Sequence, residues 1–273
     1  YDMAKVTVII PVHRVDENLY RTIDSVLRQT HCDWELLVVN MGGVEQIDSV
    51  VEKYEDGRIS FVDGDALSDN IDLVIARSSG EFFTIVHCGD VMHSAKMRIQ
   101  LKRMTKNSDI AVCSTWMKPM SNDIMNMRLV GYEGYISDPM RLLLKNNFVY
   151  RSAAMVRRSF LRERGISFGR KYSSCGEYGL WFDISRCGGK IYVEPQYLTY
   201  LDTEEKNRAP VTGINESMLL RRDILDCLLG DIADPEKRRI LIDLSESLER
   251  VEKIGLVNQE SVLDIFYNIL ARI

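Results

Sequence analysis

Polar side chains follow three of the apolar, strand-like runs in this sequence. They are His13 and Arg14 after the first run, Asn40 after the second, and His87 and Asp90 after a later one. In an open α/β sheet a ligand binds beyond the carboxyl ends of the strands, so we expect these side chains to line one site. An imidazole can stack on a base or donate a hydrogen bond, although an exposed loop histidine is the alternative for His13.

The apolar spacing predicts the elements that position these side chains. Lys5 to Pro11 is a β-branched run of the kind found in buried parallel strands. Residues 16 to 29 change to a helical period, with Leu19 and Ile23 on one apolar stripe. Trp34 to Val39 is a second buried strand, so the three elements form a βαβ unit with a right-handed crossover.

Strands and helices continue to alternate, which predicts a mostly parallel sheet covered by helices on both faces. The expected elements are a helix over 44–54, a strand over 59–62, a helix over 69–77, a strand over 82–87, a helix over 95–105 and a strand over 110–115. Residues 116–150 show weak periodicity and suggest an irregular insertion. Further elements are expected at 153–156 (strand), 159–164 and 177–185 (helices), 191–193 and 196–201 (strands), and 216–229, 235–252 and 258–272 (helices).

This pattern suggests two domains. We expect one over residues 1–205, with a nucleotide-binding half at 1–115 and an acceptor half at 116–205, and a C-terminal helical extension over 206–273.

Composition narrows the class of protein. The chain has 273 residues, 45% of them hydrophobic, which is enough for a sizeable core. A net charge of −5 and a pI near 5.5 argue against nucleic acid as a partner. The six cysteines form no CxxC pair, and no apolar run approaches the roughly 20 residues of a membrane-spanning helix. We expect a cytoplasmic protein, with the inner face of a membrane as an alternative location.

Two blocks of the sequence resemble family 2 glycosyltransferases. The first, VTVIIPVHRVDENLYRTIDSVLRQTHCDWELLVVN, is similar to the family's opening strand, helix and second strand, and SSGEFFTIVHCGD is similar to its GEYIxFLDxDD run. The second, CGEYGLWFDISRCGGKIYVEPQYLTY, is similar to the family's EDYDLWLR helix and the strand after it. The resemblance implies a glycosyltransferase A fold, which is Rossmann-like, and a nucleotide-sugar donor, often with Mn²⁺ or Mg²⁺.

The resemblance also implies an activity, the inverting transfer of a hexose to a hydroxyl in surface polysaccharide or glycoconjugate synthesis. The acceptor would be a saccharide or a lipid-linked saccharide, and whether the helical tail docks on a membrane or on another protein stays open. The residues matching the nucleotide site are Pro11, His13, Asn40 and Asp72. A solvated helix face is the alternative for Asp72.

The run that binds the metal in this family is altered here. His87 and Gly89 stand at two positions where the family has Asp, and Asp90 is the acid that remains. One carboxylate beside a histidine would hold Mn²⁺ better than Mg²⁺, but a site without a tightly bound metal is the favoured interpretation. If lost acids weaken the site, His87→Asp with Gly89→Asp should restore metal-dependent nucleotide binding.

Glu177 matches the second acid of the EDYDLW motif, which implies that it is the catalytic base. A carboxylate at the start of a helix could take the proton of the acceptor hydroxyl, or it could merely stabilise the helix through the dipole. Asn40 and Met41 stand where the family has two Asp residues. Two hypotheses therefore remain, an active glycosyltransferase and a degenerate member of the family that binds or scaffolds without catalysis.

Overall fold

The computed structural model describes most of the chain, and its contacts divide the chain into two compact units. The described residues are 4–41, 44–62, 71–120, 132–169, 171–203, 214–253, 256, 258–270 and 272. The first unit comprises Tyr1–Ile136, Val149–Phe168 and Gly189–Pro210, and the second comprises Ser137–Phe148, Gly169–Gly188 and Val211–Ile273. This division differs from the predicted boundary at residue 205, because two internal segments group with the C-terminal helices.

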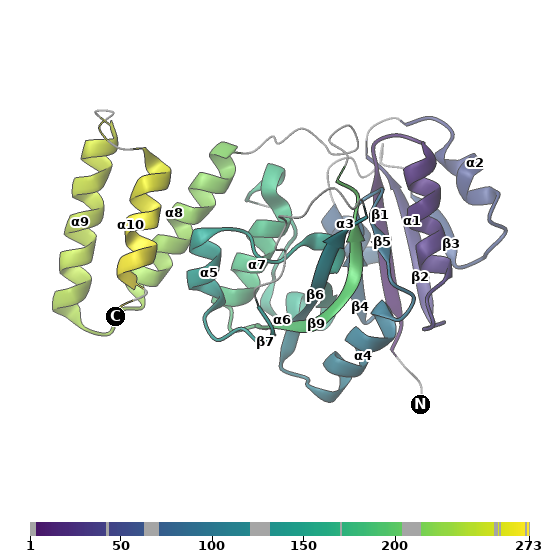
Figure 1. Cartoon of the computed structure of the whole chain (residues 1–273), viewed down its shortest axis with the longest axis horizontal. Helices are drawn as coiled ribbons and strands as arrows, with labels where there is room; N and C mark the ends of the chain where they lie inside the picture. Colours follow the sequence, from purple (N-terminus) through teal and green to yellow (C-terminus); the bar gives the residue numbers. More distant parts are fainter. Residues whose placement is uncertain are drawn as a thin grey trace. The chain divides into compact units, whose positions relative to one another are not determined.

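The described strands of the first unit form one sheet of nine, in the order β3-β2-β1-β4-β8-β6-β9-β5, with β7 paired to β9 (Figure 1). Its parallel half contains β1 (Val6–Val12), β2 (Trp34–Asn40), β3 (Ile59–Val62) and β4 (Phe82–Ile85). Every residue of β1 is buried, as its unbroken apolar run predicts for a central parallel strand.

The other half of the sheet mixes directions. β8 (Met155–Arg157) lies antiparallel between β4 and β6 (Ile110–Pro119), whereas β6 and β9 (Lys190–Leu201) are parallel. The short strands β5 (Val91–Met92) and β7 (Gly134–Tyr135) pair antiparallel with β9. The antiparallel pairings are short and the parallel ones long, so the predicted mostly parallel sheet is confirmed.

In this half of the sheet, one long strand, β9, replaces the two strands expected at 191–193 and 196–201. β9 runs without a break past Pro195, which has no N–H to donate, and the register with β6 shifts from Glu194 to Tyr197 at this point. A bulge thus absorbs the residues that separated the two expected strands.

Helices of the first unit cover this sheet. They are α1 (Glu17–Leu27), α2 (Ile47–Glu52), α3 (Ile71–Arg77), α4 (Lys96–Lys106) and α6 (Arg158–Arg164), with a short 3₁₀ turn η2 (Arg151–Ala153) before β8. α1 begins where the Asp16 side chain accepts the N–H of Asn18 at 3.0 Å, and its stripe buries Leu19 and Ile23. The expected first residues of α3, 69 and 70, lie outside the described residues.

The second unit is helical. It contains α5 (Pro139–Lys145), η3 (Ser173–Cys175), α7 (Gly176–Arg186), α8 (Ile214–Gly230), α9 (Pro235–Lys253) and α10 (Gln259–Leu270). α5 packs on α7, α8 and α10 around fully buried side chains such as Leu143, Ile224 and Phe266. α5 lies where an irregular insertion was expected, although residues 121–131 are not described. None of the described helices has the length and apolar character needed to cross a bilayer.

Candidate functional site

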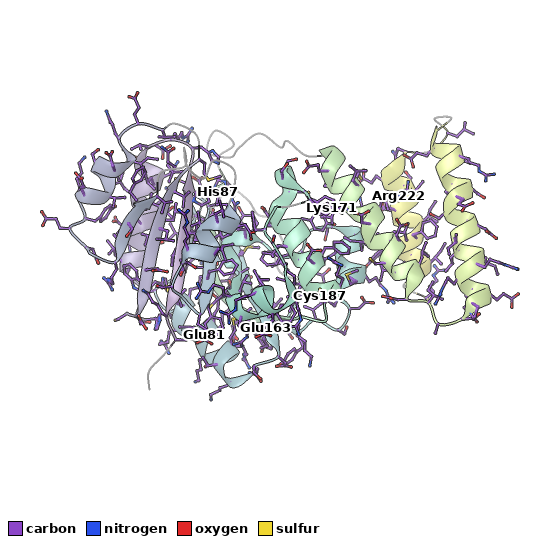
Figure 2. All side chains as sticks on the ribbon, turned by 180° about the vertical axis from the view of Figure 1, so that it is seen from behind. Glu81, His87, Glu163, Lys171, Cys187 and Arg222 are labelled. Atoms are coloured by element: carbon purple, nitrogen blue, oxygen red, sulfur yellow. The ribbon has the colours of Figure 1, made fainter. Side chains whose placement is uncertain are left out.

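The carboxyl ends of β1 and β4 bring two histidines together. The strands are parallel neighbours, and beyond their last paired residues the N–H of Val86 donates to the Ile9 carbonyl at 2.8 Å. His87 follows immediately, at the end of the sheet opposite Glu81 (Figure 2). The pKa of His13 is lowered, first by desolvation of the His13 ring and then by the nearby His87 and Arg151. Three nitrogen-bearing side chains at the strand ends thus lie near enough to interact electrostatically.

Ser152 connects η2 to the end of β4. Its buried hydroxyl oxygen accepts the backbone N–H of His87 at 2.8 Å and donates its own hydrogen to Asp90 Oδ2 at 2.6 Å. The Nδ1 atom of His87 lies 2.9 Å from the Cys88 carbonyl, which can only accept, so this nitrogen is the donor. Nε2 is therefore the ring nitrogen of His87 that can serve a ligand.

Asp90 is held inside the protein by donors from distant segments. The residue is 1% exposed, and its Oδ1 accepts the backbone N–H of Asp202, at the end of β9, at 3.0 Å. Its backbone carbonyl accepts the Thr22 hydroxyl of α1 at 2.9 Å. Burial raises the pKa of the Asp90 carboxyl, despite the opposing hydrogen bonds from Ser152 and Asp202. Both carboxylate oxygens are already occupied by the fold.

Gly89 occupies a position that other residues fit poorly. Its φ is +106°, a region that L side chains rarely adopt, and its N–H donates to the Thr22 hydroxyl at 2.8 Å. A Cβ atom here would lie 2.7 Å from Oδ2 of Asp202. That oxygen accepts from Arg21 at 3.1 Å, and Asp202 is 6% exposed. The restoring variant Gly89→Asp is therefore incompatible with this arrangement.

Pro11 and Asn40, the residues of β1 and β2 expected to contact the nucleotide, make contacts within the protein itself. Pro11 is buried within β1 opposite Val39. Asn40 is 6% exposed, and its side-chain amide donates to the Val44 carbonyl at 3.1 Å while its Oδ1 accepts the Val44 N–H at 3.0 Å. These two bonds close the turn after β2, of which residues 42 and 43 are not described. The amide thus shapes the loop at this strand end.

Asp72 lies in α3 and faces the segment after α6. Its Oδ1 accepts the backbone N–H of Phe168 at 2.9 Å. It also lines a hollow of about 400 Å³ between the two helices, together with Ile75, Ala76, Arg158, Leu161, Arg162 and Ile166. No contact joins Asp72 to the two histidines among the described residues. Its role in binding a nucleotide stays a prediction.

Glu177 belongs to the second unit, in the first turn of α7, where its side chain is half-buried. The helix thus begins one residue before the predicted start. In the same unit Glu216 accepts the N–H of Ser174 at 2.8 Å, which ties η3 to α8. The catalytic role of Glu177 stays a prediction.

Comparisons with known proteins identify the family. Residues 7–165 match the model of glycosyl transferase family 2, which is more than half of the chain. The chain belongs to this family.

Curated relatives of this family member carry related names. Glycosyltransferase GlyA of Streptococcus pneumoniae is 24% identical over 213 residues, which cover 72% of this chain and 29% of that protein. UDP-Glc:alpha-D-GlcNAc-diphosphoundecaprenol beta-1,3-glucosyltransferase WfgD of Escherichia coli is 30% identical over 108 residues, covering 38% of this chain and 42% of that protein. The matches span only 16% to 29% of the length of the first three curated relatives.

Solved structures share the fold. Staphylococcus aureus TarS 1-349 in complex with UDP-GlcNAc matches with a TM-score of 0.68 at 15% identity, covering 93% of this chain and 74% of that chain. Mannosyltransferase PcManGT from Pyrobaculum calidifontis, in complex with GDP-Man and Mn²⁺, matches with a TM-score of 0.56 at 13% identity, covering 97% and 86%. The predicted glycosyltransferase A fold is confirmed.

The side chains of this family member do not fit a divalent metal at 87–90. Hard cations need several oxygen ligands, but Asp90 is the one acid among residues 87–90 and is 1% exposed. Burial, with Asp16 nearby, raises the pKa of the Cys88 thiol to about 12, so it is no thiolate ligand. His87 alone has the arrangement of a metal-binding histidine, with Nδ1 on a carbonyl. Within the described ranges, no cluster of three or more His, Cys, Asp or Glu side chains could hold a metal ion.

Three residues of this site were not predicted, namely Arg151, Ser152 and Asp202. They lie far along the chain from β1 and β4, and β8 and β9 bring them to these strand ends. No local signal in the sequence marks them. In β8, the guanidinium of Arg157 donates to the Met104 carbonyl at 2.7 Å and so caps α4.

Proposed function

We propose that this chain is the catalytic domain of an inverting glycosyltransferase that moves a sugar from a nucleotide-sugar donor to a hydroxyl. Family membership together with the meeting of His13, His87 and Arg151 at the strand ends supports this proposal. Ligands of open α/β sheets bind at this edge, and the donor is the family's anionic substrate. The name of WfgD, a glucosyltransferase acting on a diphosphoundecaprenol-linked sugar, supports a saccharide acceptor on a lipid carrier at a membrane face.

Glu177 is the base in this proposal. Its carboxylate takes the proton of the acceptor hydroxyl while that oxygen bonds to the anomeric carbon. The bond between the anomeric carbon and the diphosphate breaks, and its electron pair leaves with the nucleoside diphosphate. The position of Glu177 in the first turn of α7 supports the role, because a carboxylate there is held by a rigid element.

The test measures release of nucleoside diphosphate from UDP- and GDP-sugars, with and without saccharide acceptors. We expect Glu177→Gln to lower kcat by about 100-fold or more at unchanged donor affinity, because general base catalysis contributes about 10² to 10⁴. Glu246→Gln is the matched control, since the Glu246 side chain is 62% exposed and pairs weakly with Arg250 at 4.0 Å. Equal activity of Glu177→Gln and wild type would contradict the assignment of the base.

A degenerate domain that binds without catalysis is the second candidate. It is favoured by the use of Asn40 to close a turn and by the burial of Asp90. Tight nucleotide binding with no turnover of any UDP- or GDP-sugar would support this candidate and contradict the proposed transferase activity.

A further inference from the structure

The carboxyl ends of β1 and β4 present one guanidinium and two imidazole rings to a ligand. His13 follows β1, His87 follows β4, and Arg151 comes from η2 directly before Ser152, whose hydroxyl contacts the His87 backbone at 2.8 Å. His13 is exposed, and the other two residues are half-buried. Desolvation lowers the pKa of His13 the most, and the nearby His87 and Arg151 lower it further. Three separate elements thus contribute nitrogen-bearing side chains to this end of the sheet, and Arg151 supplies a positive charge there.

Two acids near these side chains face the fold. Asp90 is 1% exposed, and its carboxylate accepts hydrogen bonds from the Ser152 hydroxyl and the Asp202 backbone N–H. Asp202 is 6% exposed, and its carboxylate accepts a hydrogen bond from Arg21. At position 89 the Asp202 side chain occupies the space that a third acid would need. The site therefore combines inward-facing carboxylates with more accessible nitrogen donors, which is the charge pattern of an anion site.

We propose that Arg151, with His13 and His87, binds the diphosphate of the nucleotide directly, and that this binding needs no divalent metal ion. The inference rests on the proposed function, since it concerns how the same donor is held. A guanidinium can make two parallel hydrogen bonds to phosphate oxygens, and an imidazole nitrogen donates one where it carries a hydrogen. Because Nδ1 of His87 already donates to the Cys88 carbonyl, Nε2 of that ring donates to a phosphate only in the doubly protonated form. Side chains on three elements that are themselves hydrogen-bonded together give the fixed geometry that such binding requires.

The same groups bear on departure of the leaving group. When the bond to the anomeric carbon breaks, its electron pair passes to the oxygen of the β-phosphate, so the diphosphate gains one negative charge. Fixed positive groups stabilise charge that develops in the transition state, and they need no reorganisation at that moment. In this proposal the guanidinium of Arg151, helped by hydrogen bonds from the rings, takes over the stabilisation of the leaving group.

Calorimetric titration of the whole chain with UDP, GDP and pyrophosphate, each in EDTA and in Mn²⁺, tests the inference. We expect the Kd for the nucleotide that binds to agree within about twofold between the two conditions. Arg151→Ala should weaken binding about 10- to 100-fold in EDTA, as the loss of charge-assisted hydrogen bonds implies. Arg151→Lys should recover part of it, because it keeps the charge but loses the planar fork.

Lys102→Ala is the matched control. Lys102 is exposed on α4, so this variant removes the same charge away from the strand ends and should change the Kd less than twofold. Thermal unfolding without ligand checks that Arg151→Ala is folded. The comparison of EDTA with Mn²⁺ uses the wild-type chain and so does not depend on any variant.

Each contrary outcome has a distinct meaning. Binding of UDP or GDP only with Mn²⁺ would overturn the inference and leave the proposed function standing. Metal-independent binding with Arg151→Ala equal to wild type would overturn the role of these side chains alone. Absence of binding by both nucleotides in both conditions would overturn the inference together with the proposed function.

Discussion

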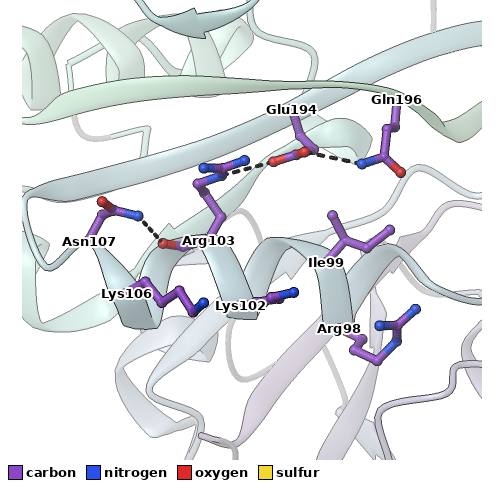
Figure 3. A pocket seen from close by; sticks show the side chains of 8 residues that line it. All are labelled: Arg98, Ile99, Lys102, Arg103, Lys106, Asn107, Glu194 and Gln196. Carbon is purple, nitrogen blue, oxygen red and sulfur yellow. Dashed lines mark hydrogen bonds and ion pairs between the residues drawn. The ribbon is translucent and has the colours of Figure 1, made fainter.

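Nitrogen-bearing side chains lie together in two regions of the first unit, the strand ends of β1 and β4 and the exposed face of α4. On α4 they project from a single helix, where Arg98, Lys102 and Lys106 line a hollow of about 250 Å³ (Figure 3). Arg103 in the same hollow is paired with Glu194 at 3.0 Å. At the strand ends the donors come from separate elements, and Ser152 joins two of these, η2 and the segment after β4. Cations on one helix face are normally solvated, whereas convergent donors can surround a ligand.

Under the proposal above, this difference means that the number of cations does not define an anion site. The strand ends hold fewer positive side chains than α4, but buried hydrogen bonds to Asp90 fix the backbone that carries them. Long exposed lysines lose rotamer entropy when they bind, and salt screens their charge beyond about 8 Å. The predictions below change one region at a time.

The largest effect should come from adding an acid to the strand ends. Gly89→Asp places a side chain at φ +106° with its Cβ 2.7 Å from the Asp202 carboxylate. Backbone strain and an extra buried charge should together lower the free energy of unfolding by about 4 kcal/mol or more. Thermal and urea unfolding measure this loss.

Gly165→Ala is the control for backbone strain alone. Gly165 ends α6 at φ +62°, and a Cβ atom at this position would point into open space. We expect a loss of about 1 kcal/mol there. Equal losses at the two glycines would contradict the role of Asp202 in closing position 89.

A smaller effect on the free energy of unfolding should follow from replacing the buried lysine of α4. Lys96 is 0% exposed, and its Nζ lies 3.5 Å from the Thr84 hydroxyl. Burial lowers its pKa from 10.5 to about 7. Between these values the unfolded chain binds a proton that the folded chain does not, so stability rises with pH by about 1.4 kcal/mol per unit.

Lys96→Met should therefore stabilise the protein at pH 7, by about 3 kcal/mol, and the gain should shrink as the pH rises toward 10. Urea unfolding at pH 7, 8 and 9 measures it. Lys102→Met, on the exposed side of the same helix, should show no such trend. A gain at Lys96 that is constant with pH would mean that the lysine is charged in the folded protein.

The smallest effect should come from the exposed face of α4. Replacing Arg98, Lys102 and Lys106 together by Gln removes three positive charges, yet we expect nucleotide Kd to change less than twofold at 150 mM salt, because screening weakens their reach. Titration with UDP and GDP measures it. A tenfold loss would erase the distinction between the two regions.

The sequence predicted much of the fold because its strongest signals are local. The unbroken apolar run of β1 and the stripe of α1 depend only on neighbouring residues. β8 was expected as a strand, but its antiparallel place between β4 and β6 depends on contacts far along the chain. The bulge at Pro195 likewise turned two expected strands into one.

The sequence likewise predicted the part of the candidate site that depends on residues next to the strands. The rule that ligands bind at strand ends selected His13, His87 and Asp90, which follow β1 and β4 directly. It could not select Arg151, which a 3₁₀ turn before an antiparallel strand brings to the site. It also treated Gly89 as a lost acid, because the positive φ and the nearby Asp202 are visible only in three dimensions.

The contact between Gly89 and Asp202 also constrains how this sequence can change over generations. An acid at position 89 collides with the carboxylate of Asp202, so the substitution is harmful while Asp202 remains. Removing Asp202 first leaves Arg21 without this ion pair. We therefore expect the effect of an acid at position 89 to depend on the residue at position 202.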